Sequence, residues 1–254
     1  MTAEQLVVFV AFPVAGYLLG SVPFAWVVGK MKGVDIRTVG SKNIGATNLG
    51  RTLGKHYFVL GFLLDAGKGF FPVLAVSLFV RHYNAQYLTP TGGPYDMLGQ
   101  YLGAFNGLPH WAPLVTAAAC FLGHLFPVWL GFKGGKGVAT SFGVVLGYWP
   151  LYTVAGLAAG LIFVVVRVAT RYISVSSIVA SVAFAVLVAG LSMVKTRYVN
   201  LYVGGSDRVV VIAVAAFFAA MIVWRHRGNI GRLMQGTEPQ IGKKERDKAK
   251  MDGA

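Results

Sequence analysis

A glycine-rich loop that carries two lysines is the stretch of this sequence best suited to chemistry. Residues 131–137 read Gly-Phe-Lys-Gly-Gly-Lys-Gly, and apolar residues precede and follow them. Glycine lacks a Cβ, so such a loop can turn several backbone N–H groups toward one point. With the charges of Lys133 and Lys136, this arrangement suits a phosphate group. The alternative is an ordinary turn between membrane helices whose lysines only mark the cytoplasmic side.

The loop is not a nucleotide-binding P-loop. No glycine stands five residues before Gly135, and Gly137 follows Lys136 where a P-loop has Ser or Thr. Support for phosphate chemistry must therefore come from other segments of the chain.

Two other polar segments carry residue types that bind anions. Residues 37–48 contain glycines, hydroxyls and amides without the hydrophobic periodicity of a helix, so we expect a polar loop there, with Arg51 shortly after it. Residues 225–238 follow a long apolar run, and His226 and Asn229 would share one face if a helix continued through them. Taken singly, the first segment also fits a plain turn, and the second fits the basic flank of a membrane span.

The same residues argue against several other chemistries. His, Cys, Asp and Glu do not cluster at ligand spacing, so we expect no metal site. Asp35 is the sole acid between residues 29 and 55, which disfavours catalysis by paired carboxylates. No clear Gly-x-Ser-x-Gly elbow supports a nucleophilic serine.

Long apolar runs must position these segments. Of 254 residues, 56% are hydrophobic and 13% are charged, which is too apolar for an ordinary soluble domain. We predict an all-α, polytopic membrane protein with seven transmembrane helices. The spans lie at about residues 6–28, 56–80, 97–130, 138–149, 151–166, 173–194 and 209–224, and the third is open to a break near residues 109–113. Prolines and glycines in the first span predict a kink or a close helix contact.

The basic residues indicate how the helices are oriented. Residues 29–55, 131–136 and 167–171 together with the tail from Arg225 carry 18 Lys and Arg, against 4 in residues 81–97 and 195–208. The positive-inside bias therefore predicts an N-terminus outside and a cytoplasmic C-terminus. We divide the chain into a membrane domain, residues 1–238, and a basic cytoplasmic tail, residues 239–254.

Two further features of charge remain. The formal charge is +14, but the basic clusters lack the pattern of a nucleic-acid interface, so anionic lipid or anionic substrates are the expected partners and nucleic acid is not. Asp65 and Lys68 lie inside the second span, three residues apart on one helix face. Intramembrane charges either pair locally or face a site, and the sequence leaves both readings open.

Four groups of residues together resemble the bacterial acyl-phosphate-dependent glycerol-3-phosphate acyltransferase family, in the family's order along the chain. They are Gly20-Ser21-x-Pro23; Arg37-x-x-Gly40-Ser41-x-Asn43-x-Gly45-Ala46-Thr47-Asn48; Gly123-His124-x-x-Pro127 with Phe132-Lys133-Gly134-Gly135-Lys136-Gly137-Val138-Ala139-Thr140; and Arg225-His226-x-x-Asn229-Ile230-x-Arg232-Leu233. The resemblance implies a seven-helix enzyme of the bacterial cytoplasmic (inner) membrane. It would transfer an acyl group from acyl-phosphate to glycerol 3-phosphate, without a cofactor. The products would be lysophosphatidic acid and inorganic phosphate, in the first acylation step of phospholipid biosynthesis.

The resemblance also implies the site and its partners. The expected catalytic residues are Ser41, Arg51, Lys136, His226 and Asn229. The expected substrate-binding residues are Asn43, Thr47, Asn48, Lys133, Gly134, Gly135 and Gly137. The partners would be glycerol 3-phosphate, acyl-phosphate and membrane lipid. Either His226 or the phosphate of the donor would accept the hydroxyl proton.

Two other classes of function remain beside the enzyme. A transporter or anion channel would also contain intramembrane charge and glycine breaks, but no inverted repeat is visible between the two halves of the chain. A structural or lipid-binding membrane protein would explain neither the glycine loop nor the Arg225-His226 pair.

Overall fold

The structure is a computed structural model that describes residues 1–85, 107–194, 201 and 203–241, and its secondary structure there is entirely helical. Six helices are long and apolar enough to cross a membrane: Ala3–Met31, Lys55–Ala85, Pro113–Leu130, Leu151–Thr170, Ile173–Leu191 and Gly205–Arg225. They confirm six of the seven predicted spans. The remaining predicted span, residues 138–149, corresponds to α8 (Val138–Gly147), which has ten residues. It is therefore about 15 Å long, half of a typical hydrocarbon core.

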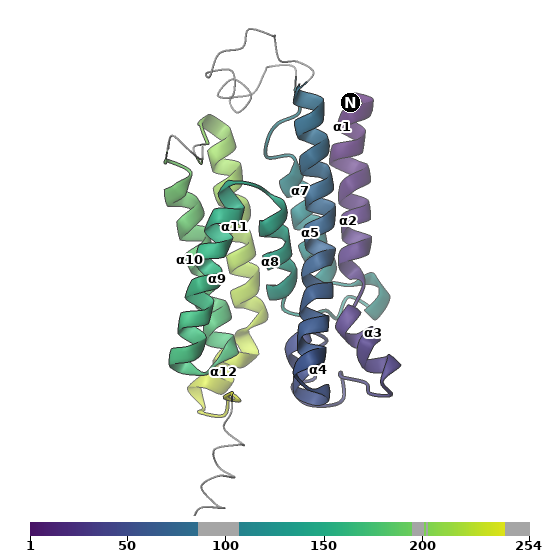
Figure 1. The fold of residues 1–254 in the computed structure, drawn as a ribbon, viewed down its shortest axis with the longest axis vertical. Helices are drawn as coiled ribbons and strands as arrows, with labels where there is room; N and C mark the ends of the chain where they lie inside the picture. The colour runs from purple at the N-terminus through teal and green to yellow at the C-terminus, as the bar shows by residue number, and fades with distance from the viewer. Residues whose placement is uncertain (86–106, 195–200, 202, 242–254) are drawn as a thin grey trace, which may run out of the picture.

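The first span is interrupted twice, as its prolines predict. α1 (Ala3–Leu6) is followed by a π-helical turn, η1 (Val7–Ala11), and then by α2 (Phe12–Ser21). Pro13 has no amide hydrogen, so the carbonyl one turn earlier loses its α-helical partner and the turn widens. The helix breaks at Val22 and Pro23, and α3 (Phe24–Met31) leaves at an angle to α2 (Figure 1).

The prediction that residues 37–48 lack a helix was wrong from Ala46 onward. Ala46–Leu53 form α4, which packs against α5 (Lys55–Ala85). Its apolar residues Ala46, Leu49 and Leu53 lie on one face, and Leu49 is fully buried against Ala25 and Ile36. An eight-residue helix is marginal alone. Packing on α5, not intrinsic propensity, therefore stabilises it.

Small residues let the next helices approach closely. α7 (Pro113–Leu125) ends before a 3₁₀ turn, η2 (Val128–Leu130). Residues 107–112 are not helical, which agrees with a break of the third predicted span near residues 109–113, and residues 97–106 lie outside the described part. A side chain at Gly20 of α2 would overlap the backbone of Cys120 in α7. α8 packs on α5 in the same way, because a side chain at Gly143 would overlap the carbonyl of Ala66.

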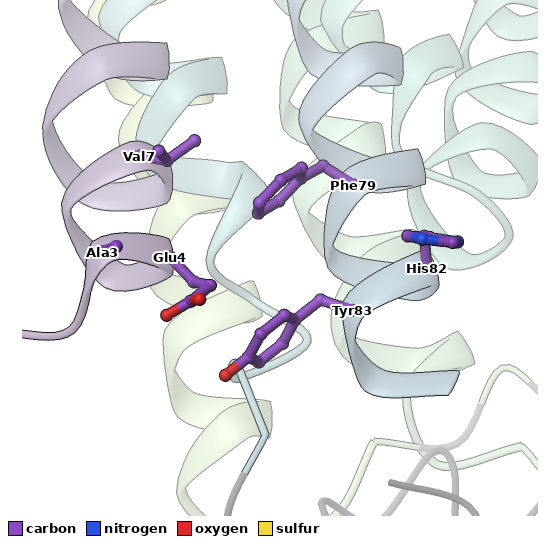
Figure 2. A pocket seen from close by; sticks show the side chains of 6 residues that line it. All are labelled: Ala3, Glu4, Val7, Phe79, His82 and Tyr83. Atoms are coloured by element: carbon purple, nitrogen blue, oxygen red, sulfur yellow. The ribbon is translucent and has the colours of Figure 1, made fainter. Parts of the chain in front are cut away.

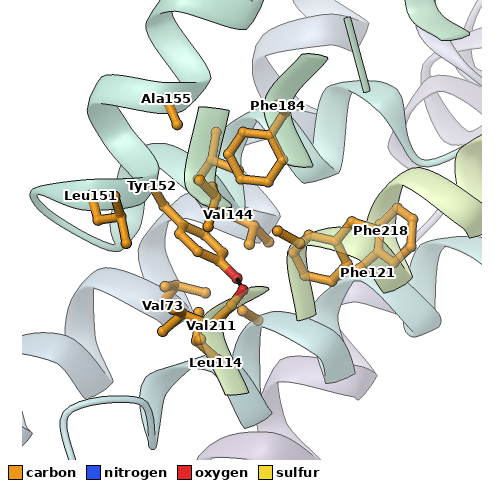
Figure 3. Packing of buried hydrophobic residues seen from close by; sticks show 14 of the residues in the cluster. Val73, Leu114, Phe121, Val144, Leu151, Tyr152, Ala155, Phe184, Val211 and Phe218 are labelled. Atoms are coloured by element: carbon orange, nitrogen blue, oxygen red, sulfur yellow. Dashed lines mark hydrogen bonds between the residues drawn. The ribbon is translucent and has the colours of Figure 1, made fainter. Parts of the chain in front are cut away.

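The main hydrophobic core joins the second half of the bundle to α5 and α7. α9 (Leu151–Thr170), α10 (Ile173–Leu191) and α11 (Gly205–Arg225) surround Tyr152, whose ring meets Phe184 edge-on at 5.2 Å between centroids (Figure 3). Its hydroxyl donates to the carbonyl of Val211 at 2.6 Å, so this buried polar group is satisfied.

The polar segments gather at one end of the bundle. The N-terminus lies at the opposite end from α3, α4 and α12 (Arg227–Met234) in Figure 1. We call the end formed by α3, α4 and the loop between them, residues 131–137, His226 and α12 the basic end. After α12 the chain still contacts the bundle, because Ile241 donates its amide to the carbonyl of Arg171 at 3.0 Å. The predicted tail begins within this segment, and residues 242–254 lie outside the described part.

Candidate active site

The glycine loop is pressed against the end of α7. A side chain at Gly134 would overlap the carbonyls of His124 and Leu125, and a side chain at Gly135 would overlap Nε2 of His124. The amide of Gly135 donates to the carbonyl of His124 at 3.1 Å. The expectation that loop amides face a phosphate therefore fails for Gly135, whose amide is already occupied.

Arg225, at the end of α11, holds the other side of the same loop. Its Nε donates to the carbonyl of Gly135 at 2.9 Å, and a terminal nitrogen donates to the carbonyl of Gly134. Gly137 then adopts φ +83° and begins α8, without a side-chain cap. The first amides of a helix have no partner within it and carry partial positive charge. The open donors of this region are therefore at the start of α8.

Lys136 links the loop to α12. Its Nζ donates to Oδ1 of Asn229 at 2.6 Å, and Nδ2 of Asn229 donates to Oε1 of Glu238 at 2.6 Å. Asn229 is buried. The structure thus brings two predicted catalytic residues into direct contact across most of the second half of the chain.

Glu238 organises this contact and was not predicted as a site residue. Oε1 also accepts from the hydroxyl of Ser174 at 2.8 Å, and Oε2 accepts from Nε of Arg232 at 2.8 Å. Burial opposes the charge, but hydrogen bonds from Asn229, Ser174 and Arg232 outweigh it and lower the pKa of Glu238. In the sequence, Glu238 was visible only as the end of a motif segment, and Ser174 lies in a distant apolar span.

Arg51 belongs to the same electrostatic group. Burial, together with the charges of Arg232, Arg51 and Arg225 and against the attraction of Glu238, lowers the pKa of Lys136 to about 8. The Arg51 side chain is exposed, yet partial desolvation lowers its pKa too. The charge of Glu238 raises the pKa of Arg51, and the charge of Arg232 lowers it. Three arginines, Arg51, Arg225 and Arg232, and one carboxylate, that of Glu238, therefore act on Lys136, and this excess of positive charge suits an anionic ligand.

His226 stands at the break between α11 and α12 and is 2% exposed. Its Nδ1 lies 2.7 Å from the carbonyl of Ile222, so we assign the ring hydrogen to Nδ1 and leave Nε2 as an acceptor. Burial and the nearby charge of Lys136 lower the pKa of His226 to about 4. The imidazole is therefore neutral at pH 7.

Asn48 fixes the polar loop that carries Ser41. Its Nδ2 donates to the carbonyls of Ile36 at 2.7 Å and Val39 at 3.1 Å, and its Oδ1 accepts from the amide of Ser41 at 2.8 Å. The Asn48 side chain is 1% exposed and fully engaged, which indicates a positioning role. The Ser41 side chain is exposed, and within the described residues its hydroxyl has no partner.

The remaining predicted binding residues lie around this group. Asn43 and Thr47 are half-buried and lie before and on α4, which also carries Arg51, whereas Lys133 is exposed in the glycine loop. The structure therefore places every predicted site residue at the basic end, although it contains no substrate that would test their roles.

A surface groove at the other end of the bundle does not belong to this site. It encloses about 350 Å³ between α1 and the end of α5, and Glu4, Phe79 and Tyr83 border it (Figure 2). Its single carboxylate and its distance from the basic end argue against a phosphate ligand there.

Comparisons with known proteins agree on one family. A family profile described as glycerol-3-phosphate acyltransferase matches residues 10–236. A curated glycerol-3-phosphate acyltransferase of Synechococcus sp. (strain CC9902) is 39% identical over 231 residues, covering 90% of this chain and 93% of that protein.

Solved structures give the same result. This chain matches PlsY (YgiH), an integral membrane glycerol 3-phosphate acyltransferase, in its glycerol 3-phosphate form, with TM-score 0.70 and 35% identity over 92% of this chain and 96% of that one. The lysophosphatidic acid form of the same enzyme matches with TM-score 0.68 and 34% identity, over 91% of this chain and 94% of that one.

Proposed function

The chain belongs to the glycerol-3-phosphate acyltransferase family, and we propose that it transfers an acyl group from acyl-phosphate to glycerol 3-phosphate. The products are lysophosphatidic acid and inorganic phosphate. The observation that carries this proposal is the hydrogen-bonded chain from Lys136 through Asn229 to Glu238. The charge of Arg51 acts on Lys136 at the same place. It assembles cations from three segments at one end of a membrane protein.

Two anions must be held together for this reaction. Lys136 and the amino end of α8 would neutralise one phosphate, and the guanidinium of Arg51 would bind the other as a fork. Holding both reactants in this way replaces a bimolecular encounter by an oriented one. The exposed Ser41 hydroxyl, in the loop before α4, would donate a hydrogen bond to a substrate bound at the basic end.

The chemistry needs little covalent help from the protein. Acyl-phosphate is a mixed anhydride, so its carbonyl is already activated. The glycerol oxygen forms the new ester bond, the carbonyl–phosphate bond breaks, and the negative charge that develops is met by the surrounding cations. Phosphate leaves with the electron pair of the broken bond.

The hydroxyl proton passes most readily to the phosphate of the donor. His226 is the alternative acceptor, but burial beside Lys136 lowers its pKa to about 4, so forming an imidazolium there is unfavourable. In our proposal Nε2 of His226 accepts a hydrogen bond from the acceptor substrate and orients it, and Asn229 keeps Lys136 in place.

The membrane supplies the donor. We propose that the basic end faces the cytoplasm, that the N-terminus lies outside, and that α8 completes a seventh crossing of a bacterial inner membrane. The acyl chain of the donor would then enter sideways from the inner leaflet, between helices that small residues allow to pack closely.

The direct test uses purified protein in lipid vesicles with acyl-phosphate and glycerol 3-phosphate. Phosphate release that requires both substrates, together with formation of lysophosphatidic acid, is the expected result. An acyl thioester in place of acyl-phosphate should give no product. Movement of glycerol 3-phosphate into vesicles without turnover would instead support the transporter, and no dependence on acyl-phosphate would overturn the proposal.

A further inference from the structure

Three buried ionisable side chains lie behind the glycine loop, and the proposed chemistry does not use them. Asp65 and Lys68 form a local pair, one of the two alternatives that the sequence leaves open, with Nζ of Lys68 3.0 Å from Oδ1 of Asp65. Nδ1 of His124 lies 3.8 Å from the same oxygen. All three are buried, and we call them the α5–α7 cluster.

Lys68 joins the cluster to the start of the polar segment. Its Nζ donates to the carbonyl of Val22 at 2.7 Å, and the ammonium lies 5.8 Å from the ring centre of Phe24. Val22 directly follows α2, and Phe24 is where α3 begins. Lys68 therefore fixes the turn through which the chain enters α3 and then the loop of Ser41.

His124 joins the cluster to the glycine loop. One ring nitrogen faces Asp65, and the other packs so closely on Gly135 that no side chain fits there. The carbonyl of His124 accepts the amide of Gly135 at 3.1 Å. The position of the ring thus sets the position of the loop that leads into Lys136.

The polar atoms of the cluster are not all satisfied by each other. Nδ1 of His124 is buried without a hydrogen bond within the described residues, and Oδ1 of Asp65 is met by the ammonium of Lys68 as an ion pair at 3.0 Å. Such groups are costly in a membrane core. A buried pair is weak evidence for stability, because an apolar pair of similar volume is often as good. Stability alone therefore does not account for this arrangement.

We propose that Asp65, Lys68 and His124 are positioning residues that set the affinity of the site for its phosphate-bearing substrates. The cluster fixes two separate site segments, the α2–α3 turn and the glycine loop, to one turn of α5. This inference rests on the proposed function, because it assigns a task within that reaction.

The decisive variant replaces both charges together, Asp65→Asn with Lys68→Met, so that no unpaired charge is left buried. We expect folded protein in which the KM of at least one phosphate-bearing substrate rises about tenfold, with a smaller fall in kcat. A second variant, His124→Asn, keeps the backbone bond to Gly135 but removes the ring, and it should show the same split. Thr116→Val is the matched control, because Thr116 lies on α7 like His124 and is also buried. Its KM and kcat should equal those of the wild type.

Native KM values in both variants would overturn the inference, because the cluster would then not affect substrate affinity. Loss of fold in both variants would also overturn it, because the role of the cluster would then be purely structural. Binding is measured separately as the thermal stabilisation produced by glycerol 3-phosphate or inorganic phosphate. A wild type that binds these but does not turn over would refute the proposed function alone, and weaker stabilisation of the variants would still support positioning. A wild type that binds neither would refute both.

Discussion

Nζ of Lys136 lies 2.6 Å from Oδ1 of Asn229, although 93 residues separate the two in sequence. The amide of Asn229 cannot turn over freely, because its Nδ2 is held by Glu238. Its oxygen must therefore face the ammonium. A single orientation of one amide thus connects the glycine loop to α12 and presents Lys136 to the site.

This contact predicts strong coupling between the two residues. Lys136→Met and Asn229→Leu should each lower kcat/KM at least a hundredfold, because a cation at the phosphate and its support are lost. The double variant should be only slightly worse than either single variant, since both remove one interaction. A double-mutant cycle in kcat/KM measures this. Fully additive losses would show that the two side chains act independently.

The low pKa of Lys136 predicts an alkaline limit of activity. Burial places this pKa at about 8, so the ammonium loses its proton as pH rises through that value. We expect kcat/KM to fall about tenfold per pH unit above it. The limit on kcat should lie higher, because a bound phosphate stabilises the charge. Lys136→Arg should move the limit of its residual activity upward; an unchanged profile would assign the limit to another group.

Glu238 should support stability more than chemistry. Its carboxylate accepts hydrogen bonds from Asn229, Ser174 and Arg232. In Glu238→Gln the NH₂ group, itself a donor, would replace one of the accepting oxygens. We expect a loss of about 1–3 kcal/mol in the free energy of unfolding. Because the folded pKa is depressed below 4.5, the wild type should also lose this stability as pH falls below that value.

Ser174→Ala tests the same carboxylate more gently, with Ser177→Ala as its control. The hydroxyl of Ser174 bonds to Glu238, whereas that of Ser177 bonds only to the carbonyl of Ile173 in its own helix. Thermal unfolding in detergent should therefore show a larger loss for Ser174→Ala. Equal losses would mean that the hydrogen bond from Ser174 of α10 to Glu238 does not contribute to stability.

Hydrophobic length predicted the spans well because the bilayer sets a minimum that sequence displays directly. The hydrophobic pattern did not predict α4, because only three of its residues are apolar on one face and glycine, Thr47 and Asn48 lie between them. That helix exists because α5 covers it, and such packing cannot be read locally. The Asp65–Lys68 pair was visible from spacing. Its contact with Val22 was not, since it depends on where α2 ends.

The candidate site shows the same division. Residue types indicated phosphate binding by Lys136 and Arg51, because few groups bind an anion well. Roles among amides were harder to predict, since Asn48 and Asn229 look alike in sequence. Burial and partners distinguish them: Asn48 holds the Ser41 loop, and Asn229 holds Lys136. Glu238 was overlooked because a lone carboxylate beside a basic flank resembles a surface residue.

The Asn48 contacts predict a defect located in the loop. Asn48→Asp keeps the acceptor for Ser41 but replaces both donors to Ile36 and Val39 with a carboxylate oxygen. Activity should fall at least tenfold while the helical bundle stays folded by circular dichroism. Thr52→Ala, which removes a bond to the carbonyl of Asn48 only, should cost little. Comparable losses in the two would attribute the defect to α4 as a whole.

His226 offers the sharpest test of how the proton moves. With a pKa of about 4 the imidazole is neutral near pH 7, and its Nε2 serves as a hydrogen-bond acceptor in our mechanism. His226→Gln keeps a polar side chain of similar reach but cannot take up a proton. We therefore expect kcat to fall by less than about tenfold, whereas loss of a general base typically costs 10²–10⁴. His82→Gln, at the opposite end of the bundle, is the control and should leave kcat unchanged. A thousandfold loss in His226→Gln, with an acid limb near pH 4 in the wild type that disappears in the variant, would make His226 the proton acceptor after all.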